Sequence, residues 1–136
     1  MGYNYGRLID HIHIVVKDLE KSRKFYKSIL NAIGRDLTYE STEAFESDEL
    51  FISRCQNNAH CSKVHLAFQV PDIKSVHKFY EVALQVGGTD NGEPGERDYH
   101  PSYYGAFVFD PDGNNIEAVF HGPTQRSTES VEMKRL

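Results

Sequence analysis

Two strand-like runs, each followed by a helix-like run, dominate the hydrophobic pattern of this chain. Residues 8–16 (LIDHIHIVV) and 63–70 (KVHLAFQV) are rich in apolar and β-branched residues, which is typical of buried strands. In the segment after each run, apolar residues recur every three or four positions, as on one face of an amphipathic helix. The pattern therefore predicts two strand–helix units.

The two units are copies of one pattern. Residues 10–34 align with residues 64–88, and in this alignment His11 corresponds to His65. An aspartate precedes each helical segment, where its carboxylate can cap free backbone N–H groups, and a glycine ends the segment. Such a repeat predicts a pseudo-symmetric architecture with equivalent histidines on equivalent strands. The capping residues are Asp18 and Asp72, and the terminating glycines are Gly34 in the first copy and Gly87-Gly88 in the second.

Shorter apolar runs after each helix predict three further strands in each copy. Each copy then has the order βαβββ, and neither copy, at about 60 residues, would bury much apolar surface alone. The predicted strands lie at 35–40, 43–47 and 50–55 in the first copy, and at 89–98, 104–109 and 115–120 in the second.

Pairing of the two copies defines the expected fold. We expect an α+β fold in which two pseudo-symmetric βαβββ modules form one curved eight-stranded sheet that encloses a metal cleft. A single domain would cover residues 1–121, with modules at about 8–55 and 63–121. Residues 122–136 form a polar C-terminal tail.

The charge and hydropathy of the chain argue against nucleic acid and membrane as binding partners. The 136 residues carry a formal net charge of −5 and no run of basic residues, which argues against nucleic-acid binding. No apolar stretch approaches the roughly 20 residues of a membrane helix, and the N-terminus lacks the apolar core of a signal peptide. We therefore expect a cytoplasmic protein that acts on a small-molecule substrate, with no membrane partner.

Histidines and a glutamate on the predicted strands suggest a metal site. His11 and His13 share a face of the first strand, because residues i and i+2 of a strand point the same way, and His65 repeats the position of His11. Glu117 lies between Ile116 and Ala118, where a carboxylate is costly to bury unless it is paired or binds a metal. Two imidazoles and a carboxylate would leave positions open on a divalent ion. Alternatively, each of these histidines and the glutamate is a polar group of the core whose hydrogen bonds are satisfied.

The loop before the predicted strand 104–109 carries further chemistry. Arg97 could pair with a substrate carboxylate or phosphate, and His100 could move a proton near neutral pH. Three tyrosines could stack on the substrate or donate hydrogen bonds to it. In the alternative reading, the tyrosines only cover the loop and Arg97 pairs with a neighbouring acid. The tyrosines are Tyr99, Tyr103 and Tyr104, and the acids are Glu96 and Asp98.

Three segments give the chain a family resemblance. The runs IDHIHIVVKDLEKSRKFY, VHLAFQV and DPDGNNIEAVF resemble the vicinal oxygen chelate superfamily, which includes glyoxalase I, bleomycin and fosfomycin resistance proteins, and extradiol dioxygenases. The resemblance covers roughly residues 8–121. It is closest to small glyoxalase-family proteins that carry a Tyr-His-Pro-x-Tyr-Tyr segment before the Asp-Pro-Asp-Gly turn.

The resemblance implies one divalent metal ion, which would be Zn, Ni, Co, Mn or Fe. Its ligands would come from the first, fifth and eighth strands, at positions that correspond to His11, His65 and Glu117. His13 stands where the family usually has an apolar or hydroxyl residue, and we expect it, with His100, to face the substrate or carry protons. Paired-module proteins of this type often form dimers, so a homodimer is expected.

Two departures from the family patterns bear on the reaction. The strand LFISRC holds no acid, although glyoxalase I draws a fourth ligand from it. Phe107 stands where extradiol dioxygenases have a tyrosine, and a phenyl ring cannot carry a proton. The resemblance thus implies a metal-dependent lyase or isomerase that acts on a small, vicinally oxygenated metabolite. The alternatives are a ligand-binding protein of the bleomycin-resistance type, without catalysis, and an extradiol-type dioxygenase.

Overall fold

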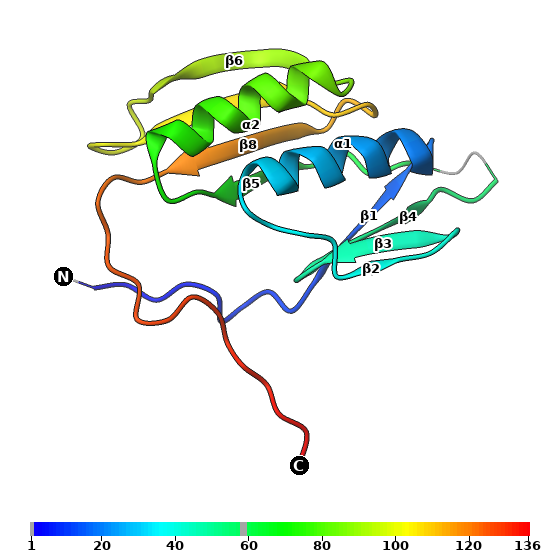
Figure 1. The fold of residues 1–136 in the computed structure, drawn as a ribbon, viewed down its shortest axis with the longest axis horizontal. Helices are drawn as coiled ribbons and strands as arrows, with labels where there is room; N and C mark the ends of the chain where they lie inside the picture. The colour runs from blue at the N-terminus through cyan, green and yellow to red at the C-terminus, as the bar shows by residue number, and fades with distance from the viewer. Residues whose placement is uncertain (1, 58–59) are drawn as a thin grey trace.

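Each half of the chain folds as a βαβββ module, as the repeat predicts (Figure 1). The computed structural model describes residues 2–57 and 60–136. The first module contains β1 (Ile12–Val16), α1 (Leu19–Ala32), β2 (Tyr39–Glu40), β3 (Ala44–Ser47) and β4 (Leu50–Arg54). The second contains β5 (His65–Gln69), α2 (Ile73–Gln85), β6 (Thr89–Glu96), β7 (Tyr104–Phe109) and β8 (Asn115–Phe120).

The strands form two four-stranded sheets with equivalent topology. Their orders are β1-β4-β3-β2 and β5-β8-β7-β6, and the first two strands of each order run parallel. The α+β class and the two modules are therefore confirmed. The strands are divided between two sheets, however, instead of forming one sheet of eight.

The segment that joins the two modules binds the edge of β1. Ser62, in the segment that joins the modules, donates its backbone N–H to the carbonyl of Val15 at 2.9 Å. Its hydroxyl oxygen accepts a hydrogen bond from the N–H of Val15, also at 2.9 Å. The connecting segment thus occupies backbone groups that a neighbouring strand would need. Within the described residues, no backbone pairing joins β1 to β5.

The predicted caps begin both helices. Asp18 accepts a hydrogen bond from the N–H of Lys21, and Asp72 accepts one from the N–H of Ser75. These bonds satisfy N–H groups that have no partner inside a helix. Neither helix in the described part of the chain has the length and apolarity that crossing a bilayer requires.

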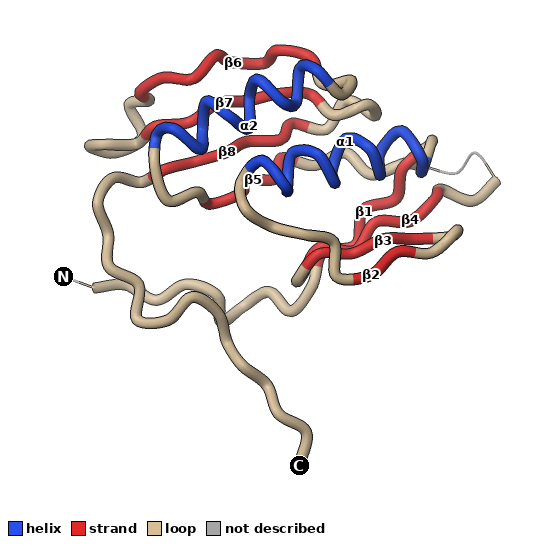
Figure 2. Tube along the Cα trace, in the orientation of Figure 1, coloured by secondary structure: helices blue, strands red, loops and turns tan. Residues whose placement is uncertain are grey.

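The two helices lie side by side and cover one face of each sheet (Figure 2). Fully buried side chains from both helices and both sheets meet in one core. Its largest members include Phe25 and Tyr26 on α1, Phe79 on α2, and Ile52 and Ile116 on the sheets. The opposite face of each sheet carries no helix (Figure 1), and we call these the open faces. In the described part of the chain, these faces are free of helices.

Candidate functional site

Strand register places the predicted acid on the open face of the second sheet. Glu117 on β8 pairs with Ala67 on β5 and with Phe107 on β7. His65 lies two residues before Ala67, so its side chain points to the same face. Three neighbouring strands thus bring an imidazole, a carboxylate and a phenyl ring together.

The Glu117 carboxylate is buried and has a different partner on each oxygen. The residue is 2% exposed, while the side chain of His65 is 54% exposed. His65 donates from Nε2 to Oε2 of Glu117 at 2.8 Å, and the Tyr103 hydroxyl donates to Oε1. The His65 ring also tilts against the Phe107 ring, with 5.9 Å between centroids. The acid therefore lies beneath an exposed imidazole at the surface of the sheet.

Comparison with the other buried acid shows what distinguishes Glu117. Asp110 is 3% exposed and accepts hydrogen bonds from Tyr26, from the side-chain amide of Asn114, and from the backbone N–H groups of Asp112 and Asn114. Such a carboxylate is stabilised by local donors. Glu117 instead accepts hydrogen bonds only from side chains, an imidazole and a phenol, and the imidazole is exposed on the open face.

The donor set at Glu117 therefore fits a divalent metal at two positions. Imidazole nitrogen and carboxylate oxygen are ordinary ligands of Zn, Fe, Ni, Co and Mn, and here they already converge on each other. A third ligand is not beside them. Among the described residues, no group of three or more His, Cys, Asp or Glu side chains is arranged to hold a metal.

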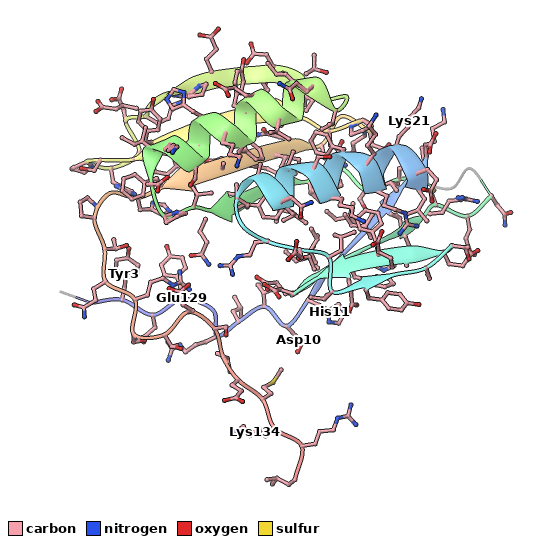
Figure 3. All side chains as sticks on the ribbon, in the orientation of Figure 1. Tyr3, Asp10, His11, Lys21, Glu129 and Lys134 are labelled. Carbon is pink, nitrogen blue, oxygen red and sulfur yellow. The ribbon has the colours of Figure 1, made fainter. Side chains whose placement is uncertain are left out.

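The predicted third ligand lies on the other module. His11 precedes β1, its side chain is 67% exposed, and its Nδ1 lies 2.6 Å from an oxygen of Asp10. Figure 3 shows Asp10 and His11 on the segment that leads into the first sheet. His13 points to the open face of that sheet, where its Nε2 lies 2.7 Å from the Ser53 hydroxyl and its ring contacts Phe51. A cavity of about 460 Å³ extends beside Phe51 and Ser53.

A ring cluster borders Glu117 at the end of β8. His121 follows Glu117 by four residues, so strand alternation continued past β8 gives it the same face. Its Nδ1 lies 2.8 Å from Nε2 of His100, and both imidazoles contact the edge of the Tyr103 ring. His121 has no predicted role in the sequence, although its alternation from Glu117 is the signal that identifies it.

When both imidazoles are neutral, hydrogen bonding determines which nitrogen of each ring carries the proton. Nδ1 of His100 lies 2.8 Å from the carbonyl oxygen of Pro101, so it must carry the proton and donate. Nε2 of His100 is then an acceptor, and Nδ1 of His121 is its donor. Partial burial, with His100 beside it, lowers the pKa of His121 and favours this neutral form. In this neutral arrangement, Nε2 of His121 carries no proton.

Burial also determines the state of Tyr103. Desolvation, with the Glu117 carboxylate as its hydrogen-bond acceptor, raises the pKa of the Tyr103 hydroxyl well above its ordinary value. The phenol therefore stays protonated at neutral pH and acts as a donor to Glu117.

Arg97 donates hydrogen bonds to backbone carbonyls of its loop and not to an acidic side chain. It donates from Nη1 to the carbonyl of Glu96 at 3.2 Å and from Nη2 to the carbonyl of Glu93 at 2.8 Å. Its guanidinium also lies over the Phe107 ring, 5.3 Å from the centroid. A cavity of about 280 Å³ adjoins this loop, and its lining residues are Glu96, Arg97, Asp98, His100, Pro101, Ser102 and Tyr103.

The remaining loop tyrosines lie in different surroundings. Tyr99 is 69% exposed and meets the Tyr103 ring edge to face at 4.8 Å. Tyr104 points to the helix side of the sheet, where its hydroxyl lies 2.8 Å from Nε2 of His77 on α2. Of the predicted substrate-binding residues, Arg97, Tyr99 and Tyr103 thus lie near Glu117, whereas Tyr104 does not.

Comparisons with known proteins agree with this architecture. The sequence model of the Glyoxalase/Bleomycin resistance protein/Dioxygenase superfamily matches residues 8–118. A search of curated proteins found no match. Among solved structures, a glyoxalase/bleomycin resistance protein from Albidiferax ferrireducens T118 is similar, with 28% identity, a TM-score of 0.72, and coverage of 82% of this chain and 98% of that chain.

Two more distant structures share the fold. A glyoxalase-related enzyme from Fulvimarina pelagi has 22% identity and a TM-score of 0.67, with coverage of 84% of this chain and 88% of that chain. A glyoxalase I variant from Zea mays has 23% identity and a TM-score of 0.61. There the match covers 82% of this chain and 45% of the longer maize chain.

Proposed function

Since the chain belongs to the Glyoxalase/Bleomycin resistance protein/Dioxygenase superfamily, we propose that it is a metal-dependent enzyme with lyase- or isomerase-type chemistry on a small, vicinally oxygenated metabolite. The observation that carries this proposal is the buried Glu117 carboxylate beside His65 on an open sheet face. His65 and Glu117 are two of the proposed ligands of one divalent ion. A bound ion would withdraw charge from two adjacent substrate oxygens and stabilise a developing oxyanion.

His11 is the third proposed ligand, and a second copy of the chain would supply it. In the repeat, His11 holds the position that His65 holds in the second module. A homodimer in which the first module of one copy faces the second module of the other would bring the two positions together. The exposure of His11 leaves its ring accessible for such a contact.

The loop residues have proposed roles around the substrate. His100 and His13 are candidates for proton transfer, because an imidazole exchanges protons near neutral pH. Arg97 uses two of its five N–H donors on backbone carbonyls, so further donors remain for an anionic group of the substrate. Tyr99 offers an exposed ring against Tyr103, which lines the loop cavity.

Metal content of the purified protein tests the proposal. We expect about one ion per chain, by mass spectrometry of untagged protein prepared without chelator, and its loss in Glu117→Gln, which removes the charge and keeps the shape. Glu43→Gln, at an exposed position, is the matched control and should retain the metal. The proposal fails if the wild type binds none of Zn, Ni, Co, Mn or Fe after each is added back. It also fails if Glu117→Gln keeps its full content.

A ligand-binding protein of the bleomycin-resistance type is the second candidate. The observation in its favour is that the described residues of one chain do not gather three metal-binding side chains. In that case the open faces would hold a ligand without a chemical step. Wild-type protein that stays metal-free, yet is stabilised against heat by a flat or charged small molecule, would favour this candidate.

A further inference from the structure

We propose that Tyr103 is a positioning residue that holds one oxygen of Glu117, so that the carboxylate offers a metal only its other oxygen. The inference rests on the proposed function, because it concerns how Glu117 would bind the ion. It gives Tyr103 a role distinct from substrate binding.

The first support is that each oxygen of the Glu117 carboxylate has a different hydrogen-bond partner. The Tyr103 hydroxyl donates to Oε1, whereas His65 Nε2 lies 2.8 Å from Oε2. A metal that takes the place of the shared proton between His65 and Glu117 leaves the Tyr103 contact intact. A carboxylate with one oxygen already hydrogen-bonded then binds through the free oxygen, and its orientation is fixed before the metal arrives.

The second support is a glycine that makes room for the phenol. Gly105 lies between Tyr103 and Phe107 along β7 and pairs with Val119 on β8. A Cβ atom at Gly105 would stand 3.2 Å from Oε1 of Glu117 and 3.4 Å from Cε1 of Tyr103. The Tyr103 ring therefore passes across the bare backbone of Gly105 to reach the carboxylate. A side chain at this position would crowd Oε1 of Glu117 and lie in contact with the Tyr103 ring.

The third support is the set of rings that hold Tyr103 in place. The imidazoles of His100 and His121 meet its ring edge to face, each with 5.2 Å between centroids. Tyr99 meets it in the same way at 4.8 Å. The hydrogen bond between the two histidines ties the strand after Glu117 to the loop before Tyr103. The phenol is thus positioned on several sides as well as at its hydroxyl.

The test compares the metal affinity of Tyr103→Phe with that of the wild type. This variant keeps the ring and removes the hydroxyl, so we expect the affinity for Zn²⁺ and Co²⁺ to fall by about 10- to 100-fold, with the stoichiometry unchanged. Titration in competition with a chromophoric chelator measures this. The visible spectrum of bound Co²⁺ should also change, because the freed oxygen can then join the coordination sphere.

Two further variants separate positioning from general loss of structure. Gly105→Ala keeps the Tyr103 hydroxyl but places a methyl group 3.2 Å from Oε1 of Glu117, the oxygen that accepts from Tyr103, so it should disturb this contact and lower the affinity. Tyr104→Phe removes the neighbouring hydroxyl, which faces α2, and should leave affinity and spectrum as in the wild type. Circular dichroism and the melting temperature check that each variant is folded.

The outcomes distinguish this inference from the proposed function. If the wild type binds metal, Glu117→Gln loses it, and Tyr103→Phe keeps wild-type affinity and the wild-type Co²⁺ spectrum, the positioning role is wrong and the metal site stands. If the wild type binds none of Zn, Ni, Co, Mn or Fe after each is added back, both proposals are overturned together.

Discussion

At the scale of single residues, the two buried carboxylates of the second module serve different ends. Asp110 is surrounded by four hydrogen-bond donors and acts within the fold, where the hydroxyl of Tyr26 on α1 reaches it at 2.6 Å. Glu117 has two partners and an exposed imidazole above it. The position of Glu117 in a strand predicts that its burial is costly. The hydrogen-bond donors around Asp110 and Glu117 indicate which of the two carboxylates is the better candidate to bind a ligand.

Tyr26→Phe tests the structural role of Asp110. The variant keeps the buried ring and removes one hydrogen bond to a charged acceptor, so we expect the free energy of unfolding to fall by about 1.5–3 kcal/mol. Urea denaturation measures the change, with Tyr39→Phe at an exposed position as the control. Equal stability of wild type and Tyr26→Phe would show that the remaining donors satisfy Asp110 without the phenol.

At the scale of elements, the capped helices follow from local sequence, while their packing depends on close approach. Asp18 and Asp72 begin the helices by bonds that involve only the next turn. Gly88 is needed for a different reason, because a Cβ there would stand 2.7 Å from the Ala83 carbonyl oxygen and 2.9 Å from Cε2 of Phe25. The glycine thus lets the end of α2 approach the ring of α1.

Gly88→Ala should therefore destabilise the contact between the helices. The added methyl group meets backbone on one side and a fully buried ring on the other, so relief requires a shift of one element. We expect a loss of about 1–3 kcal/mol in the free energy of unfolding, measured by chemical denaturation. Gly2→Ala, where a Cβ meets nothing within 4 Å, is the matched control. A stability equal to that of the control would contradict the packing argument.

At the scale of the whole molecule, the repeat builds two equivalent open faces and divides the predicted ligands between them. His65 and Glu117 lie on the second module, and His11 lies at the entrance to the first. Closed symmetric dimers are the commonest oligomers, and twofold symmetry would create two identical sites from such halves. If His11 is the third ligand, the protein should form a homodimer in which each copy supplies His11 to the metal site of the other.

Mixing two variants that each lack bound metal tests whether the copies exchange His11. His11→Ala and Glu117→Gln should each lose bound metal alone, because each breaks both sites of its own homodimer. In an equal mixture after unfolding and refolding together, hybrid dimers hold one intact site, so metal content should return to about a quarter of the wild-type level. Mass spectrometry of the repurified mixture measures it. A mixture that binds no more metal than its components would exclude exchange of His11 between copies.

Much of the architecture could be read from the sequence because it depends on local signals. Strand composition, helical periodicity and capping aspartates act over a few residues, and the repeat showed that they occur twice. The division into two sheets could not be read, since it depends on which distant backbone groups pair, and in the structure Ser62 binds the edge of β1. Short β2, only Tyr39–Glu40, likewise fell inside a longer predicted strand.

The sequence by itself determined the βαβββ repeat, the caps, and Glu117 and His65 as a candidate pair, because alternation along a strand fixes the face of each side chain. The tertiary structure decided what surrounds that pair. It brought Tyr103 across Gly105 to the carboxylate, joined His100 to His121, and left His11 on the other module. Such contacts depend on register and on the packing of distant segments, which no local pattern encodes.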